Sequence, residues 1–120
     1  MKDSVTDISA LREVGGFIGA CLVDSETGLM LGSEGGGPLD LEVASAGNTE
    51  VVKAKLQVMK HLSINDRIED ILITLSTQFH LIRLLDSNPS IFLYLAVHRK
   101  SANLGMARIQ MKRVEQSLSI

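Results

Sequence analysis

Apolar residues run almost without interruption over residues 17–23 and return at residues 29–31, with a polar stretch between them. That stretch begins with Asp24 and Ser25, which can hydrogen-bond their own backbone, and ends with Gly28, which accepts a positive φ. The pattern therefore predicts a β-hairpin. Because the first strand lacks the alternation of apolar and polar residues, it is expected to be buried on both faces, which requires helices on both sides of its sheet.

Three further apolar segments lie at residues 68–75, 79–85 and 91–97, and short polar turns separate them. Their content of Ile, Leu, Phe and Tyr is typical of strands, and the short spacing predicts an antiparallel meander. The last segment is apolar at both odd and even positions, so we expect both of its faces to be covered.

Helical periodicity predicts a short helix at residues 4–14, a long one at 39–62 and a last one at 101–118. The first begins with Ser4 and Asp7, which resemble a capping box. The last carries an apolar stripe of Leu104, Ala107, Met111, Val114 and Leu118. These elements predict an α+β fold with the order α-β-β-α-β-β-β-α, in which helices cover both faces of a five-stranded antiparallel sheet. The length suits a single domain over residues 1–120.

The long helix carries two apolar stripes. The wider one consists of Ala44, Gly47, Val51, Ala54, Val58 and Leu62. Its small residues would let the helix lie close to the sheet, so this stripe is predicted to face the sheet. Val52, Leu56 and Met59 form a second ridge beside it. Because one sheet needs only one stripe, the second ridge indicates burial against another chain.

Composition narrows the function classes. The single Cys21 excludes an internal disulfide framework and suits a reducing compartment. The first residues lack the apolar core of a signal peptide, and no stretch approaches the roughly 20 apolar residues of a membrane span. We therefore expect a soluble, cytoplasmic protein without a membrane span. Aromatic residues make up 3% of the chain, so base stacking has few side chains to use, and no nucleic-acid partner is expected.

Charge is unevenly distributed along the chain. Residues 1–52 carry a net charge of −7 and residues 53–120 a net charge of +5. Such polarity can guide a charged protein partner, and it can equally arise from solvated helix faces. Five bases gather near the last helix, at Arg99, Lys100, Arg108, Lys112 and Arg113. They could bind phosphates, an acidic partner or a membrane surface, although a solvated face is the simpler interpretation.

No constellation for catalysis or cofactor binding emerges from the sequence. The glycine-rich residues 32–37 lack the Lys-Ser or Lys-Thr pair of a phosphate-binding loop, and Asp40 at the next helix start would repel a phosphate. Cys21 lies among apolar strand residues with no base nearby, which favours a buried, inert thiol. We therefore expect neither a cofactor nor enzymatic activity.

A metal site is not expected either. Three histidines lie on separate elements without metal-ligand spacing, although the last two could approach each other on neighbouring strands: His61, His80 and His98. Asp66, Glu69 and Asp70 cluster before the third strand. They could bind a cation or act as acid and base, but a solvated loop is the more ordinary interpretation.

Two short motifs, taken with the element order, resemble the Roadblock family of dynein light chains and bacterial small-GTPase regulators. One is the hairpin Gly19-Ala20-Cys21-Leu22-Val23-Asp24 with Gly28-Leu29 after its turn. The other is Asn103-Leu104-Gly105-Met106-Ala107-Arg108 at the start of the last helix. The resemblance covers nearly the whole chain. The triple glycine at residues 35–37 and the short C-terminus depart from better-known members, and they leave open whether the chain accelerates GTP hydrolysis.

The resemblance implies a profilin- and longin-like fold and a dimer, here a homodimer. In such a dimer the third strands of two copies pair into one continuous sheet, and the two long helices lie side by side. The residues expected at the interface are Val52, Leu56, Met59, Ile71, Leu72 and Ile73.

The resemblance also implies a non-catalytic regulator or scaffold that binds a small Ras-like GTPase. The expected binding surface is a polar row that paired helices would leave outward: Ser45, Thr49, Lys53, Gln57 and Lys60. The basic last helix is the competing surface. The alternative function is a profilin- or PAS-like sensory or small-ligand module, which would need a cavity between helix and sheet; the small residues of the wider stripe argue against one.

Overall fold

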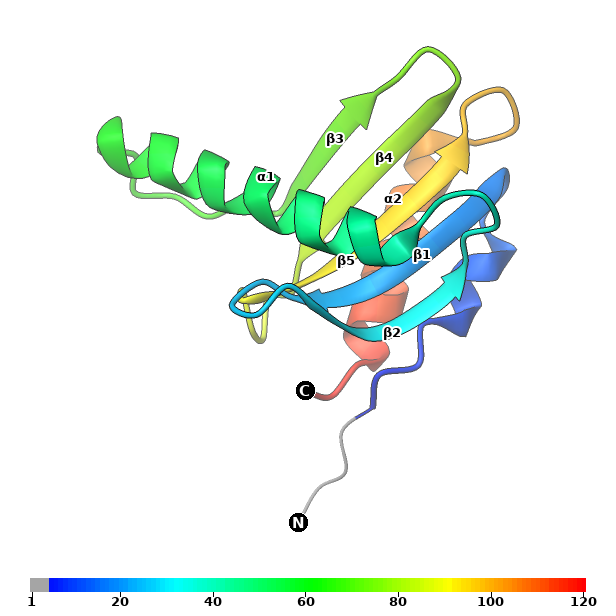
Figure 1. The fold of residues 1–120 in the computed structure, drawn as a ribbon, viewed down its shortest axis with the longest axis horizontal. Coiled ribbons are helices and arrows are strands. Elements are labelled where there is room, and N and C mark those ends of the chain that lie inside the picture. The colour runs from blue at the N-terminus through cyan, green and yellow to red at the C-terminus, as the bar shows by residue number, and fades with distance from the viewer. Residues whose placement is uncertain (1–4) are drawn as a thin grey trace.

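The structure is a computed structural model that describes residues 5–120. Five antiparallel strands form one sheet in the spatial order β2-β1-β5-β4-β3 (Figure 1). The strands are β1 (Phe17–Asp24), β2 (Leu29–Gly35), β3 (Asp70–Thr74), β4 (Gln78–Leu84) and β5 (Ile91–His98). The helices are the 3-10 helix η1 (Ser9–Glu13) and the α-helices α1 (Leu41–His61) and α2 (Leu104–Ser117). The predicted α+β fold class is confirmed.

β5 is the central strand and is buried on both faces. Residues 91–97 are at most 4% exposed, because helices cover the sheet from two sides. Phe92 packs in the core under α1, together with Val52, whereas Leu93 packs in the opposite core with Met111 of α2. Figure 1 shows α1 crossing in front of the sheet and α2 behind it. The two helical layers and the predicted inner stripe of α2 are therefore as expected.

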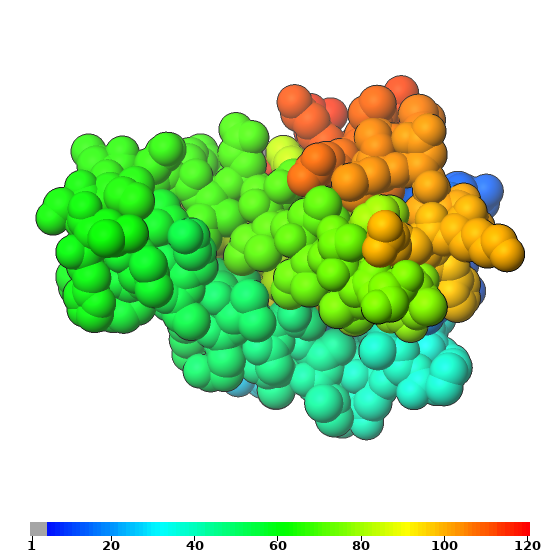
Figure 2. All heavy atoms as spheres, turned by 90° about the horizontal axis from the view of Figure 1, so that it is seen from above, coloured from blue at the N-terminus to red at the C-terminus, as the bar shows by residue number. Residues whose placement is uncertain are grey.

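β3 lies at one edge of the sheet. It pairs with β4 from Asp70 opposite Arg83 to Thr74 opposite Phe79, and within residues 5–120 no strand pairs with its other side. The C-terminal half of α1 extends past this edge in Figure 1, and in Figure 2 it forms a lobe that projects from the rest of the chain. The third strand thus has the free edge that the sequence interpretation requires.

Turn chemistry fixes the hairpin and the entry into α1. Gly28 has a φ of +76°, and the backbone N–H of Glu26 donates to Asp24 Oδ1 at 2.9 Å. The glycines at residues 35–37 all have positive φ, between 53° and 107°. Side chains would strain all three, which explains the triple glycine. Asp40 then caps α1, since its carboxylate accepts from the N–H groups of Glu42 and Val43.

The predicted helix at residues 4–14 is wrong over half of its described length. Ser4 lies outside the described residues, Val5 forms an isolated bridge with Ser119, and only Ser9–Glu13 is helical. The β-branched residues near Val5 favour extended backbone, and pairing with the C-terminal segment supplies the hydrogen bonds that a helix would have made.

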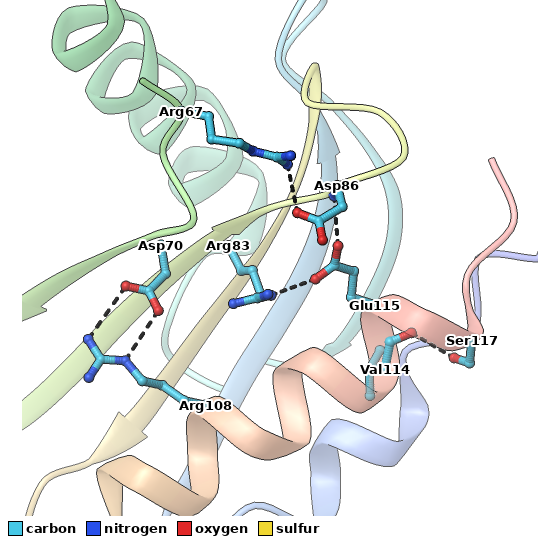
Figure 3. Close-up of polar contacts among 8 residues, drawn as sticks. All are labelled: Arg67, Asp70, Arg83, Asp86, Arg108, Val114, Glu115 and Ser117. Atoms are coloured by element: carbon cyan, nitrogen blue, oxygen red, sulfur yellow. Dashed lines mark hydrogen bonds and ion pairs between the residues drawn. The ribbon is translucent and has the colours of Figure 1, made fainter. Parts of the chain in front are cut away.

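Ion pairs join α2 to the sheet beside β3 (Figure 3). Glu115 of α2 binds Arg83 of β4 at 2.5 Å, with side chains only 8% and 11% exposed, and its other carboxylate oxygen accepts from the backbone N–H of Asp86 at 2.7 Å. Arg108 of α2 lies 3.2 Å from Asp70 at the start of β3. The edge strand is thereby held against the helix behind it.

Replacing Glu115 with Ala should lower the free energy of unfolding by about 3 kcal/mol, because Arg83 would remain buried without its partner. Urea denaturation at fixed chain concentration measures the loss. Arg67→Gln is the matched control: it breaks the pair with Asp86, whose side chains are 55% and 64% exposed, and should cost below about 1 kcal/mol. Equal losses in the two variants would show that the buried pair stabilises the fold no more than the exposed pair does.

Candidate functional site

The face of α1 that packs on the sheet contains two hydroxyl residues. Its buried positions follow steps of three, four or seven residues: Leu41, Ser45, Thr49, Val52 and Met59. The Ser45 hydroxyl donates to the carbonyl of Leu41 at 2.7 Å, and the Thr49 hydroxyl donates to the carbonyl of Ser45 at 2.7 Å. Because both hydroxyls are satisfied within the helix, these small side chains can be buried without an unpaired polar atom.

The predicted outward polar row is therefore wrong at two positions. Ser45 and Thr49 are 1% and 3% exposed, so neither can contact a partner directly. Lys53, Gln57 and Lys60 are exposed, as predicted. What remains of the row lies on the C-terminal half of α1.

The two apolar stripes of α1 have exchanged roles. The stripe predicted to face the sheet points outward, with Val51, Val58 and Leu62 exposed by 37%, 46% and 62%. The predicted outer ridge faces the sheet side instead, and Val52 (1%) and Met59 (8%) are buried within this chain. Their assignment to a dimer interface is wrong.

Leu56 lies on the same side of the helix as Val52, yet it is 43% exposed. By helical spacing it points as Val52 does, toward the layer of the sheet. Leu56 belongs to the C-terminal half of α1, which extends past β3 in Figure 1. The projecting half of α1 consequently has apolar residues both on its outward stripe and on its underside.

A cleft and a groove flank α1 on the side of its outward stripe. The cleft, of about 590 Å³, lies between Val51 and Lys55 of α1 and the segment from Ile64 to Ile71. The groove, of about 310 Å³, lies nearer the start of α1, where Ala44 and Asn48 face His80 of β4 and Tyr94 of β5. We call this second feature the His80 groove.

The floor of the His80 groove is a neutral hydrogen-bonded pair. The Tyr94 hydroxyl lies 3.1 Å from His80 Nδ1, and His80 Nε2 lies 2.7 Å from the side-chain oxygen of Gln78. Burial lowers the pKa of His80 and raises the pKa of Tyr94 to about 12. An apolar group could therefore occupy this groove without displacing a charge from water.

Cys21 lies buried between the sheet and α1, as predicted. Its Sγ is 3.7 Å from the Ser45 hydroxyl. Burial raises the pKa of the Cys21 thiol to about 11, so the thiol is protonated at neutral pH. A protonated, enclosed thiol is a poor nucleophile, and the residue acts as part of the core.

The other candidate residues do not gather into a site. His80 contacts Tyr94, whereas His98 is exposed at the end of β5. Asp70 binds Arg108, and Asp66 accepts from the backbone of Arg67. Within residues 5–120 no group of three or more His, Cys, Asp or Glu side chains could hold a metal ion.

The basic cluster is only partly available to a partner. Arg99 donates to the carbonyl of Leu75 at 3.0 Å and lies over the ring of Phe79, and Arg108 is paired with Asp70. Lys112 and Arg113 are exposed on α2. In the part of the chain that the structure describes, no helix combines the length and apolarity needed to cross a bilayer.

No protein-family profile matches the sequence, and no curated protein matches it. The structure is similar to a Roadblock/LC7 domain from Streptomyces avermitilis, with a TM-score of 0.78 at 12% identity over 91% of this chain and 88% of that one. The chain has the Roadblock/LC7 fold. It is also similar to the gliding protein MglB of Thermus thermophilus, with a TM-score of 0.75 at 19% identity over 91% of this chain and 79% of that one.

MglB of Myxococcus xanthus is a further structure with this fold. It superimposes with a TM-score of 0.72 at 16% identity, over 83% of this chain and 78% of that one. The TM-scores establish the Roadblock/LC7 fold of the present chain. Because the identities are low, its activity has to be argued from its own surfaces.

The Cys21 thiol should make stability depend on pH above about 9. The unfolded thiol loses its proton near pH 9, whereas the folded thiol keeps it until about pH 11, so the free energy of unfolding falls between these values. One such group gives a slope of about 1.4 kcal/mol per pH unit. Cys21→Ala should cost about 1 kcal/mol at pH 7 and reduce this slope.

Urea denaturation at pH 8, 9 and 10 measures the slope. The range stops at 10 because burial also raises the pKa of Tyr94, from 10.0 to about 12. At higher pH, Tyr94 would therefore add its own slope to the free energy of unfolding. An unchanged slope in Cys21→Ala, or rapid labelling of the native thiol by a maleimide, would contradict the buried, protonated state.

Proposed function

We propose that this chain is a non-catalytic regulator or scaffold that acts as a homodimer and binds a small Ras-like GTPase. The Roadblock/LC7 fold and the Roadblock-like motifs at residues 19–24 and 103–108 support this proposal. The single observation that carries it is that the free edge of β3 and the outward apolar stripe of α1 lie at the same border of the molecule.

Both features are unfavourable in an isolated copy. A free strand edge presents unpaired backbone groups, and a contiguous exposed apolar face remains in water. Pairing β3 with β3 of a second copy about a two-fold axis would satisfy the edge. It would also bring the partner's sheet beneath the projecting half of α1, where Leu56 is exposed. Ile71, Leu72 and Ile73 would then join the outward stripe in the interface.

The GTPase is proposed to bind the opposite, polar side of α1. Lys53, Gln57 and Lys60 are exposed there and would remain accessible beside paired helices. The two lysines could pair with acidic residues of the GTPase, which would make association sensitive to salt. Lys112 and Arg113 of α2 form the competing surface.

The sensory alternative has no support beneath α1. The argument from the small residues of the wider stripe is wrong, because Gly47 and Ala54 are exposed. Ser45, Thr49 and Val52 are instead the residues of α1 that are buried against the sheet. The clefts flanking α1 open at the surface and adjoin the apolar stripe, which suits a protein partner better than an enclosed small molecule.

Charge reversal tests the GTPase surface. Lys53→Glu with Lys60→Glu should weaken binding of a Ras-like GTPase from the source organism, measured by titration calorimetry with the GTPase loaded with GDP or a GTP analogue. We expect at least a roughly tenfold loss, about 1.4 kcal/mol. The matched control is Lys112→Glu with Arg113→Glu, which should bind normally, and light scattering should find both variants dimeric.

The reverse pattern would move the binding surface to α2. If no Ras-like GTPase of the organism binds the wild-type chain in either nucleotide state, the proposed function is wrong.

A further inference from the structure

The outer side of α2 combines exposed apolar residues with positive charge. Met106 and Ile109, one helical turn apart, are 49% and 45% exposed. Lys112 and Arg113 follow them on the exposed side of the helix. We call these four residues the α2 face, and we propose that the α2 face docks on a membrane surface that contains anionic lipids. This surface is separate from the proposed GTPase surface, which lies on α1.

The positive charge of the α2 face is not compensated by acidic side chains of α2. Residues 99–114 contain five cationic side chains and no acidic one, although the whole chain has a net charge of −2. Glu115, the acidic residue of α2, is turned inward to Arg83, and its side chain is only 8% exposed (Figure 3). Within residues 5–120, no acidic side chain forms an ion pair with Lys112 or Arg113.

Like charges lie close together on α2. Arg108 and Lys112 are four residues apart, so they are neighbours on the helix surface, and like charges at this spacing are unfavourable. Asp70 offsets the charge of Arg108, from which it lies 3.2 Å away. An anionic surface would relieve the remaining repulsion around Lys112 and Arg113, because each cation near such a surface is attracted to it. Negatively charged lipid headgroups therefore complement the α2 face.

The apolar residues favour a membrane over other anionic partners. The phosphates of a nucleic acid would attract the cations but offer little apolar surface to Met106 and Ile109. An amphipathic acidic peptide binds best in a groove, whereas the cleft and the His80 groove both lie beside α1 and contain no residue of α2. The interfacial region of a bilayer provides anionic headgroups for lysine and arginine and an acyl boundary for apolar side chains.

The position of α2 would leave the GTPase surface accessible. α2 lies on the side of the sheet away from α1 (Figure 1). In the homodimer proposed above, paired β3 edges would continue one sheet, so both copies of α2 would lie on the same side of it. This step rests on that homodimer, and two linked α2 faces would bind a membrane more tightly than one. A GTPase bound on the α1 side would then be held at the membrane without touching it through α2.

Cosedimentation of the full chain with lipid vesicles tests the proposal. The wild-type chain should bind phosphatidylcholine vesicles that contain about one-third phosphatidylglycerol, and it should not bind vesicles of phosphatidylcholine alone. Raising the salt concentration from about 0.1 M to about 1 M should release most of the bound chain, because salt screens the attraction. Lys112→Gln with Arg113→Gln should lower the partition coefficient by roughly thirtyfold. The matched control, Lys53→Gln with Lys60→Gln, removes the same charge from α1 and should bind as the wild type does.

Ile109→Ser separates a membrane from a purely electrostatic partner. Isoleucine and serine have similar helix propensities and Ile109 is 45% exposed, so circular dichroism should show an unchanged fold. This variant should bind the anionic vesicles roughly fivefold more weakly, because it loses an apolar side chain at the bilayer interface.

Three results would overturn the proposal: no binding of the wild-type chain to anionic vesicles, equal losses in the α1 control, or tighter binding to a DNA duplex than to the vesicles. Vesicle binding by a chain that light scattering finds monomeric would support the α2 face and contradict the homodimer. Vesicle binding by a chain that binds no Ras-like GTPase would support the α2 face and contradict the proposed function.

Discussion

The length of α1 relative to the sheet is the constraint that shapes the surface of this protein. α1 has 21 residues, so its axis is about 31 Å long at 1.5 Å per residue. Five strands spaced about 4.8 Å apart place the two outer strands only about 19 Å from each other. Because α1 crosses the strands, it is longer than the sheet is wide, and the C-terminal half of the helix extends past β3 (Figure 1).

Several apolar residues of α1 remain exposed. Val52 lies over the sheet and is 1% exposed, whereas Leu56, one turn later on the same side, is 43% exposed. The same border of the molecule holds the unpaired edge of β3. Beneath the first half of α1, burial raises the pKa values of Cys21 and Tyr94 and lowers that of His80, so these three groups are uncharged at neutral pH. An apolar group packed against them would displace no charge from water.

Most of the fold can be predicted from patterns among residues that are close together in the sequence. The uninterrupted apolar strand before Asp24, the turn that ends at Gly28 and the inner stripe of α2 each depend on neighbouring residues, and each is found as predicted. The rotation of α1 about its axis is different, because it depends on which side of the helix meets the sheet. Ser45 and Thr49 count as polar in any pattern of hydrophobicity, yet their hydroxyls bond to carbonyls of the same helix and are buried.

The wrong rotation of α1 also explains why the candidate site was predicted with the wrong residues. With Ser45 and Thr49 scored as polar, the stripe containing Val51 and Val58 was the better inner face, and the true outer face was assigned to the sheet. The spacing of four residues from Leu41 to Ser45 and Thr49, directly after the Asp40 cap, is the one signal that could have corrected it. The sequence indicates that α1 has two apolar faces, of which one sheet can bury only one. That inference does not depend on which face is outward.

Hydrogen exchange at β3, followed by mass spectrometry over a range of chain concentrations, tests the central claim most directly. The account predicts that amides in residues 70–74 are protected at high concentration, where β3 pairs with a second copy, and exchange faster as dilution separates the copies. Amides of β5, which are paired on both sides within one copy, provide the internal control. Exchange at β3 that is fast and independent of concentration would contradict the account.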